Sequence, residues 1–480
     1  MRFTRLFSGL VLAAILVAAC APAATTAAPT IAAPTAAATT AAATEAPTTA
    51  APTTAAVTAA ATQATTSATA TVAPTPAATT AAGQTEVQFW HVYSAGSAQS
   101  KAMDALIAAF NAANPDVNVI GTYQGSYPDI SKKITAAIAG NALPDVAVSY
   151  QNDIANYLLS GAKIQPLDAW ITDTQVGFSA TDLQDIFPSY IDHYPGSNNQ
   201  VLSVAYNRSM EVMFYNSDLL AASGITQPPA SWDDFMTDCA KLAQTTAGQQ
   251  CYAISADASR FANWVWSRGG QLLSADGKTV AFQDAGLASL QFLNTLVTKN
   301  YAYLIAKQFG DQSDFAVGKA AFTFGSSAGI PFYDSAIKGS AKPFKWGVAP
   351  TPHTTANPVV DVYGPSVVIF NNSTPKAQAA WRFVKYLMSA DANAKWVQAT
   401  AYFPARKSTL DQLKAYISTN ALYGTLVADL QYGQNEPQIA AWTPIRTVLG
   451  DAITAVASGA STPADAITTA VDKSNAALAK

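Results

Sequence analysis

Histidine and cysteine are scarce in this chain, which has only three of each among its 480 residues. The histidines, His91, His193 and His353, lie far apart in the sequence and lack the spacing of metal ligands. Charged residues make up only 12%, and the formal net charge of −4 provides no basic excess to attract nucleic acid. We therefore expect no metal site, no cofactor and no nucleic-acid partner.

Long apolar runs are missing beyond the first twenty residues, so nothing there predicts a further membrane-spanning segment. The first twenty differ, because Arg2 and Arg5 precede a short apolar stretch at 6–17, and two alanines then lead into Cys20. This layout is typical of a secretory signal and is too short to span a bilayer well. An ordinary secretory signal needs no cysteine at this point.

Residues 17–20, Val-Ala-Ala-Cys, resemble the lipobox of bacterial lipoproteins. The resemblance implies that the signal peptide 1–20 is removed and that Cys20 becomes an acylated amino terminus. Several acyl chains hold a protein on a membrane more durably than one chain does. We expect a secreted protein that a lipid on Cys20 anchors to the outer face of the cytoplasmic membrane.

Charge and aromatic side chains are almost absent from residues 21–83, where Glu45 is the only charged residue and Ala, Thr and Pro dominate. Such a composition buries too little apolar surface to offset the entropy lost on ordering. We expect a disordered tether, whose Thr and Pro content would also suit O-glycosylation.

The two remaining cysteines, Cys239 and Cys251, are close in the sequence. Because two cysteines remain once Cys20 carries the lipid, and because the space outside the cell is oxidising, we expect one local disulfide between them, which would close a short loop. Zinc is a poor alternative because no histidine lies near either residue in the sequence.

The rest of the chain, 84–480, is roughly 400 residues long, which exceeds what one core usually supports. Residues 87–90 and 145–150 are predicted strands, whereas 103–110 and 130–138 carry apolar residues at helical spacing. Alternation of this kind predicts an α/β fold with parallel-type sheets and two domains or lobes.

An ordered set of short segments carries a family resemblance. The chain resembles extracellular solute-binding proteins of ABC importers, of the maltose-binding type and nearest to the glycerol-3-phosphate-binding members. The segments are FWH at 89–91, TYQGSY at 122–127, GNALPDV at 140–146, FYNSDLL at 214–220, PASWDDF at 229–235, WRFVKYLMS at 381–389 and YFPARK at 402–407.

This resemblance implies a two-lobed fold of the periplasmic-binding-protein type (type II), with discontinuous lobes joined at a hinge. By analogy, the N-lobe comprises 84–212 and 350–386, and the C-lobe comprises 213–349 and 387–480. The resemblance also implies a monomer without catalysis, which captures a sugar, a polyol phosphate or a phosphodiester and delivers it to an ABC permease in the membrane. A sensory role without transport is an alternative.

Ligand-binding residues are predicted from chemistry and from the resemblance. Polyols need closely spaced hydrogen-bonding groups and aromatic faces over their C–H surfaces. Aromatic candidates in loops or near strand ends are Tyr93, Tyr123, Tyr127, Tyr150, Trp264, Trp266, Tyr363, Tyr402 and Trp442. The ligand-binding residues that we predict are Tyr123 (with Tyr127 as the second match to the same family tyrosine), Gln151, Ser209, Trp264, Ser326, Ser327, Gly364, Tyr402 and Arg446.

The resemblance matches Arg446 with the anion-binding arginine of the glycerol-3-phosphate binders, and a guanidinium offers a planar fork suited to phosphate. Its alternative role is a surface ion pair with Asp451 or packing on a helix. Gln151 replaces a glutamate of the glycerol-phosphate binders, which leaves a neutral sugar open as the solute. Arg208 and Arg260 are further cations expected near the site.

Two enzymatic alternatives come from other motifs. Gly-Ser-Ser-Ala-Gly at 325–329 matches a nucleophile elbow, and Asp334 and His353 follow Ser327 in the order of an esterase triad. Both partners come within about 30 residues of the serine, whereas such hydrolases place them after further βα units. A glycosidase needs two carboxylates flanking a bond, and no such pair stands out.

Overall fold

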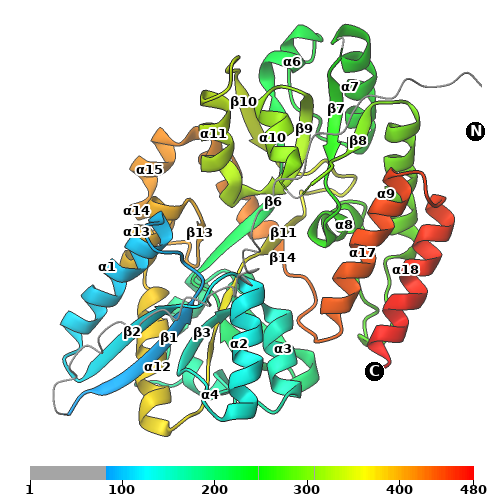
Figure 1. Ribbon diagram of the computed structural model, residues 1–480. Helices are drawn as coiled ribbons and strands as arrows, with labels where there is room; N and C mark the ends of the chain where they lie inside the picture. Colours follow the sequence, from blue (N-terminus) through cyan, green and yellow to red (C-terminus); the bar gives the residue numbers. More distant parts are fainter. Residues whose placement is uncertain (1–82, 247, 308) are drawn as a thin grey trace, which may run out of the picture. The chain divides into compact units, whose positions relative to one another are not determined.

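Strands and helices alternate from Thr85 onward in this computed structural model, which describes residues 83–246, 248–307 and 309–480 (Figure 1). All of them belong to one unit, Pro76–Lys480. The signal peptide 1–20 with its Cys20 and the tether up to residue 82 lie outside the described residues. The lipid anchor and the disordered tether therefore stay predictions.

The first sheet has six strands within the described residues. Their order is β2 (Val117–Tyr123), β1 (Thr85–His91), β3 (Val146–Ser149), β12 (Ser366–Ile369), β5 (Gln200–Val204) and β4 (Ile191–Tyr194). β1 is parallel to β2 and β3, but β12 is antiparallel to β3 and β5. The predicted parallel-type sheet is thus mixed, because β12 enters it directly from the other sheet.

The amino-terminal strand and helix show why the local sequence folds as it does. Alternate residues Val87, Phe89 and His91 of β1 are buried, as expected for a strand with one face on a core. The following helix α1 (Ala98–Ala113) begins at Ser97, whose side chain accepts a hydrogen bond from the Ser100 amide. Its buried stripe covers the same core.

The second sheet has eight strands within the described residues. They are β14 (Gly433–Gln434), β11 (Val360–Tyr363), β6 (Asn207–Asn216), β9 (Ala320–Ser326), β7 (Gln250–Ile254) and β8 (Ala302–Leu304), with β10 (Trp346–Ala349) and β13 (Phe403–Pro404) paired to β6. Nine of the ten β6 residues are buried, and the strand is antiparallel to β9, β10, β11 and β13. β6 is therefore the central element of this sheet.

Helices surround both sheets. Those before β9 are α2 (Tyr127–Gly140), α3 (Gln151–Leu159), α4 (Asp168–Ile171), α5 (Ala180–Asp185), α6 (Ser217–Ala222), α7 (Trp232–Thr245), α8 (Ala258–Trp266), α9 (Gln283–Thr298) and α10 (Gly310–Ala316). Those after it are α11 (Ile330–Lys338), α12 (Thr374–Leu387), α13 (Ala390–Thr400), α14 (Thr409–Gln412), α15 (Lys414–Thr419), α16 (Ala421–Val427), α17 (Trp442–Ala457) and α18 (Pro463–Leu478). Figure 1 shows α9, α17 and α18 side by side, and these three helices are in contact.

The chain passes between the two sheets three times, the last time between β12 and β13, and the first two crossings are neighbours. It leaves the first sheet after β5 and enters β6, and it returns from β11 to β12 through Gly364 and Pro365. Gly364 has φ +141°, a backbone conformation that favours glycine. The first two crossings are linked because the Arg208 guanidinium donates to the Gly364 carbonyl at 2.6 Å.

The exact lobe boundaries stay a prediction. The predicted lobe boundary at residue 387 assigns α13 to the C-lobe, together with α17 and α18. In the structure α13 packs on α1, and its Trp396 and Val397 share a hydrophobic core with Phe89 of β1. We therefore favour a boundary later than 387.

Cys239 of α7 and Cys251 of β7 form a disulfide with a Cα–Cα distance of 5.1 Å. Both residues are buried in the core that covers the second sheet. The bond closes a loop with a sequence separation of 12.

Replacing both residues, Cys239→Ala with Cys251→Ala, should lower the free energy of unfolding by about 3 kcal/mol, because the unfolded chain regains the entropy of the open loop. Urea unfolding of both proteins without reductant measures the difference. Reductant should destabilise the wild type and leave the variant unchanged. Equal unfolding midpoints in oxidising buffer would contradict a stabilising disulfide.

Candidate functional site

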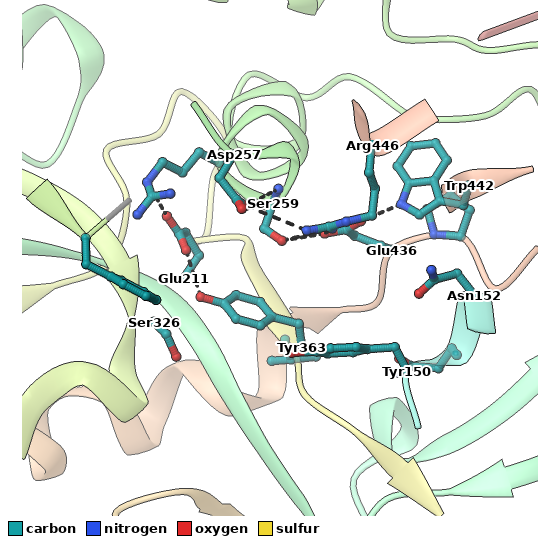
Figure 2. A pocket seen from close by; sticks show the side chains of 15 residues that line it. Tyr150, Asn152, Glu211, Asp257, Ser259, Ser326, Tyr363, Glu436, Trp442 and Arg446 are labelled. Atoms are coloured by element: carbon teal, nitrogen blue, oxygen red, sulfur yellow. Dashed lines mark hydrogen bonds and ion pairs between the residues drawn. The ribbon is translucent and has the colours of Figure 1, made fainter. Parts of the chain in front are cut away.

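A cavity of about 410 Å³ lies among residues of both sheets and has the size of a small-solute site. Three of its residues stand at the carboxyl ends of strands: Tyr150 follows β3, Ser326 ends β9, and Tyr363 ends β11. Ligands of open α/β sheets bind at such ends. The lining consists of Tyr150, Gln151, Asn152, Glu211, Asp257, Ser259, Arg260, Phe309, Ser326, Val362, Tyr363, Glu436, Pro437, Trp442 and Arg446 (Figure 2).

Arg446 of α17 is the centre of one polar cluster in the cavity wall. Its Nη1 donates to a Glu436 carboxylate oxygen and, at 3.1 Å, to the Ser259 hydroxyl. Its Nη2 lies 3.7 Å from the Asp257 carboxylate. Burial opposes the charge of Arg446, but Glu436 and Asp257 raise its pKa above the ordinary value. Figure 2 shows the guanidinium between these two acidic side chains.

Glu436 gathers further donors from neighbouring elements. The Ser259 hydroxyl donates to it at 2.6 Å, and the indole Nε1 of Trp442 also donates to it. Ser259 itself lies in the first turn of α8, where the Asp257 side chain caps the helix. Because α8 and α17 both begin here, one carboxylate holds the starts of two helices together.

Glu211 of β6 is the centre of a second cluster. Its carboxylate lies 3.4 Å from Arg260 Nε and accepts a hydrogen bond from the Tyr363 hydroxyl at 2.9 Å. Arg260 also lies 3.4 Å from Asp311 and donates to the Phe324 carbonyl at 2.9 Å. Burial raises the pKa of Glu211 to about 7, against the opposing effect of the Arg260 charge.

Asp361 lies on β11 next to Val362 of the cavity wall and is fully buried. Neither of its carboxyl oxygens accepts a hydrogen bond from an N–H or hydroxyl group of the described residues, and its acidic neighbour is Glu436. Burial and the nearby Glu436 charge raise the pKa of Asp361 well above its usual range. Physical chemistry therefore favours the neutral acid at this position.

Three predicted binding residues line the cavity: Gln151, Ser326 and Arg446. The Gln151 amide packs against Arg208, and in the orientation that satisfies both groups its oxygen accepts from Arg208 Nη2 at 2.7 Å. Arg446 pairs with Glu436 and Asp257, and not with the Asp451 considered from the sequence.

Three other predicted residues support the wall from behind. The Ser209 hydroxyl donates to the Tyr363 carbonyl at 3.1 Å. The Ser327 hydroxyl is fully buried and accepts from the Met210 amide at 3.0 Å. Gly364 is outside the lining, at the crossing between β11 and β12.

Tyr123, Trp264 and Tyr402 are also outside the lining. Tyr123 is 48% exposed at the end of β2, and Trp264 is buried in the core of the second sheet. Tyr402 packs against the first core cluster near Trp396. Among the wider aromatic candidates, Tyr150, Tyr363 and Trp442 do line the cavity.

Sequence reasoning missed the acidic residues of the site: Glu211, Asp257 and Glu436. One local signal was available, because Asp257 and Ser259 follow a buried strand in the pattern of a helix cap. Glu211 and Glu436 could have been noticed from composition, because the full sequence contains few glutamates.

The three residues of the esterase alternative are engaged elsewhere. Asp334 forms an ion pair with Lys338 and is 41% exposed, whereas Ser327 is fully buried. The His353 ring nitrogen lies 2.8 Å from the Thr355 carbonyl. The structure thus does not bring Ser327, Asp334 and His353 together as a triad.

Within residues 83–246, 248–307 and 309–480, no three or more His, Cys, Asp or Glu side chains are grouped so that they could hold a metal ion. No helix in that same part of the chain has the length and apolar character needed to cross a membrane.

Most of the chain matches a known protein family. Residues 105–425 match the family described as "Bacterial extracellular solute-binding protein". The sn-glycerol-3-phosphate-binding periplasmic protein UgpB of Yersinia pseudotuberculosis is 24% identical over 418 residues, 82% of this chain and 92% of that protein. A putative binding protein of Brucella abortus is 25% identical over 386 residues, 78% of this chain and 88% of that protein.

Solved structures share the fold. The cyclic alpha-maltosyl-1,6-maltose binding protein from Arthrobacter globiformis aligns with a TM-score of 0.71 and 20% identity, over 82% of this chain and 99% of that chain. The complex of UgpB from Mycobacterium tuberculosis with glycerophosphocholine aligns with a TM-score of 0.69 and 22% identity, over 83% of this chain and 99% of that chain. The predicted two-lobed α/β fold is confirmed.

The raised pKa of Glu211 predicts a pH effect on stability. Because the folded state holds this proton more tightly than the unfolded chain, its stabilising effect is complete below the unfolded pKa of 4.5 and is lost as the pH rises through about 7. Between pH 5 and pH 8, the free energy of unfolding of the wild type should therefore fall by roughly 2–3 kcal/mol relative to that of Glu211→Gln. Urea titrations at both pH values measure this difference, and parallel pH profiles of the two proteins would contradict it.

Proposed function

Starting from the fact that this chain belongs to the bacterial extracellular solute-binding proteins, we propose that it captures a sugar or a glycerol-phosphate-type solute in the cavity described above. The observation that carries this proposal is the chemistry of the lining. Aromatic faces from Tyr150, Tyr363 and Trp442 stand beside carboxylates, hydroxyls and amides. This combination suits a hydroxylated solute, which presents C–H surfaces and closely spaced hydrogen-bonding groups.

Contact with both lobes gives the solute a way to change the protein's conformation. Asn152 and Asn156 of α3 donate to the Thr443 hydroxyl of α17 at 2.8 and 3.1 Å, next to the cavity. A solute that touches both lobes binds the closed form more tightly than the open form, and it therefore shifts the protein toward the closed form. We infer that an ABC permease in the membrane recognises this closed form and receives the solute chemically unchanged.

The amino terminus completes the proposal. A lipid on Cys20 would anchor the monomeric protein at the outer face of the cytoplasmic membrane, and the tether of residues 21–83 would carry the solute-binding part. The family membership supports an extracellular or periplasmic location. The names of the relatives, which cite glycerol 3-phosphate and maltose-type sugars, support the two solute classes.

A panel of maltose-type sugars, sn-glycerol 3-phosphate and glycerophosphocholine tests solute binding by thermal shift. A bound solute at 100 times its Kd should stabilise the protein by about 2.7 kcal/mol. Ser326→Trp, which puts a large side chain into the cavity, should abolish the shift. A shift that persists in this variant would contradict the cavity as the site.

The lipid anchor has a separate test. Cys20→Ser removes the acylated sulfur, so the protein should leave the membrane fraction and appear in the soluble extracellular or periplasmic fraction. Fractionation followed by immunoblotting measures the distribution, with Glu86→Gln on β1 as a control that keeps the lipobox and the disulfide. Membrane association of Cys20→Ser equal to that of wild type would count against the anchor.

A further inference from the structure

We propose that the cavity selects solutes without net negative charge, and that Glu436 determines this specificity by occupying the Arg446 guanidinium. The inference rests on the proposed function and narrows its solute class. It departs from the glycerol 3-phosphate named for several relatives. Both arginines of the cavity are already paired with carboxylates of this chain.

Arg446 is held on both of its terminal nitrogens. Nη1 faces Glu436 and the Ser259 hydroxyl, and Nη2 faces Asp257. A bidentate bond to phosphate needs two parallel N–H groups pointing at the ligand. A phosphate here would have to displace Glu436, which itself accepts hydrogen bonds from Ser259 and Trp442.

Arg260 is engaged in the same way and its side chain is only 11% exposed. Glu211 lies at its Nε and Asp311 at its Nη2, each at 3.4 Å. It also donates to the Phe324 carbonyl. Because its Nε and Nη2 are both engaged, Arg260 does not offer a phosphate two free nitrogens side by side.

The charge balance of the site leaves nothing for an anion to neutralise. Five carboxyl groups stand in and behind the wall, against the two guanidiniums of Arg260 and Arg446; they are Glu211, Asp257, Asp311, Asp361 and Glu436. No lysine or histidine is among the described residues that line the cavity. Even with Glu211 and Asp361 protonated, three carboxylates face two arginines.

Three helix starts offset this remaining negative charge. α3 and α17 begin at the cavity without a side-chain cap, α8 begins there with Asp257 as its cap, and each contributes a partial positive charge of about half an elementary charge at its first turn. The site as a whole is therefore close to neutral. A phosphate dianion would add uncompensated charge to a partly enclosed space, which is unfavourable.

A neutral sugar fits this environment, because its hydroxyls can donate to the carboxylates and accept from the N–H groups at the helix starts. A zwitterion of zero net charge, such as a glycerophosphodiester with a cationic head group, has the same overall charge. Its cation would suit the aromatic faces of Tyr150 and Trp442.

The test compares wild type with Glu436→Gln, which keeps an acceptor for Ser259 and Trp442 but removes the negative charge. Calorimetric titrations use inorganic phosphate, sn-glycerol 3-phosphate, glycerophosphocholine and maltose. We expect Glu436→Gln to bind phosphate and glycerol 3-phosphate at least about tenfold more tightly than wild type. Affinity for maltose or glycerophosphocholine should change much less.

Glu86→Gln on the remote strand β1 is the matched control and should bind the whole panel as wild type does. Asp257→Asn, which frees the other side of Arg446, is a second variant in case Glu436→Gln fails to fold, and it should show the same gain. No gain of phosphate affinity in the folded variants would overturn the inference. So would tighter binding of glycerol 3-phosphate than of the neutral solutes to wild type, although that result would leave the proposed function standing. A phosphate gain in Glu436→Gln, with no member of the panel bound by wild type, would support the charge assignment and count against the proposed solute classes.

Discussion

A fully buried ion pair between Arg208 of β6 and Asp192 of β4, 2.9 Å long, joins the two sheets at the place where the chain crosses between them. Arg208 also binds the Gly364 carbonyl, and Asp192 accepts from Gln438 at 3.0 Å in the segment before α17. Removing one partner of such a pair leaves an uncompensated buried charge, which typically costs 3–5 kcal/mol. The first two crossings and the start of α17 therefore depend on one interaction.

The solute site follows from this arrangement. Three residues after Arg208, β6 brings Glu211 to the cavity, where it meets Arg260 and Tyr363. The segment held by Gln438 leads into α17 and so places Arg446 against Glu436. The polar wall of the cavity is thus built from short segments of β6 and α17, and the ion pair at the crossing between the sheets fixes the position of each segment.

Much of the fold could be predicted from the sequence, because alternating strands and helices have local signals such as the Ser97 cap and the buried alternation of β1. Gln151, Ser326 and Arg446, which were predicted from strand ends or matched motifs, line the cavity. Trp264, predicted as an aromatic candidate, lies in the core of the second sheet, because the sequence does not show which face of α8 meets that core. The partners of Arg446 could not be predicted, because Asp257 and Ser259 are far from it in the sequence.

The most direct test is equilibrium dialysis of purified protein with a binding sugar from the panel, followed by mass spectrometry of the recovered solute. The account predicts one molecule bound per chain, recovered with unchanged mass after prolonged incubation, in a complex whose crystal structure shows contacts to Tyr150 from one lobe and Trp442 from the other. A recovered compound of altered mass, or a solute bound away from these two side chains, would contradict it.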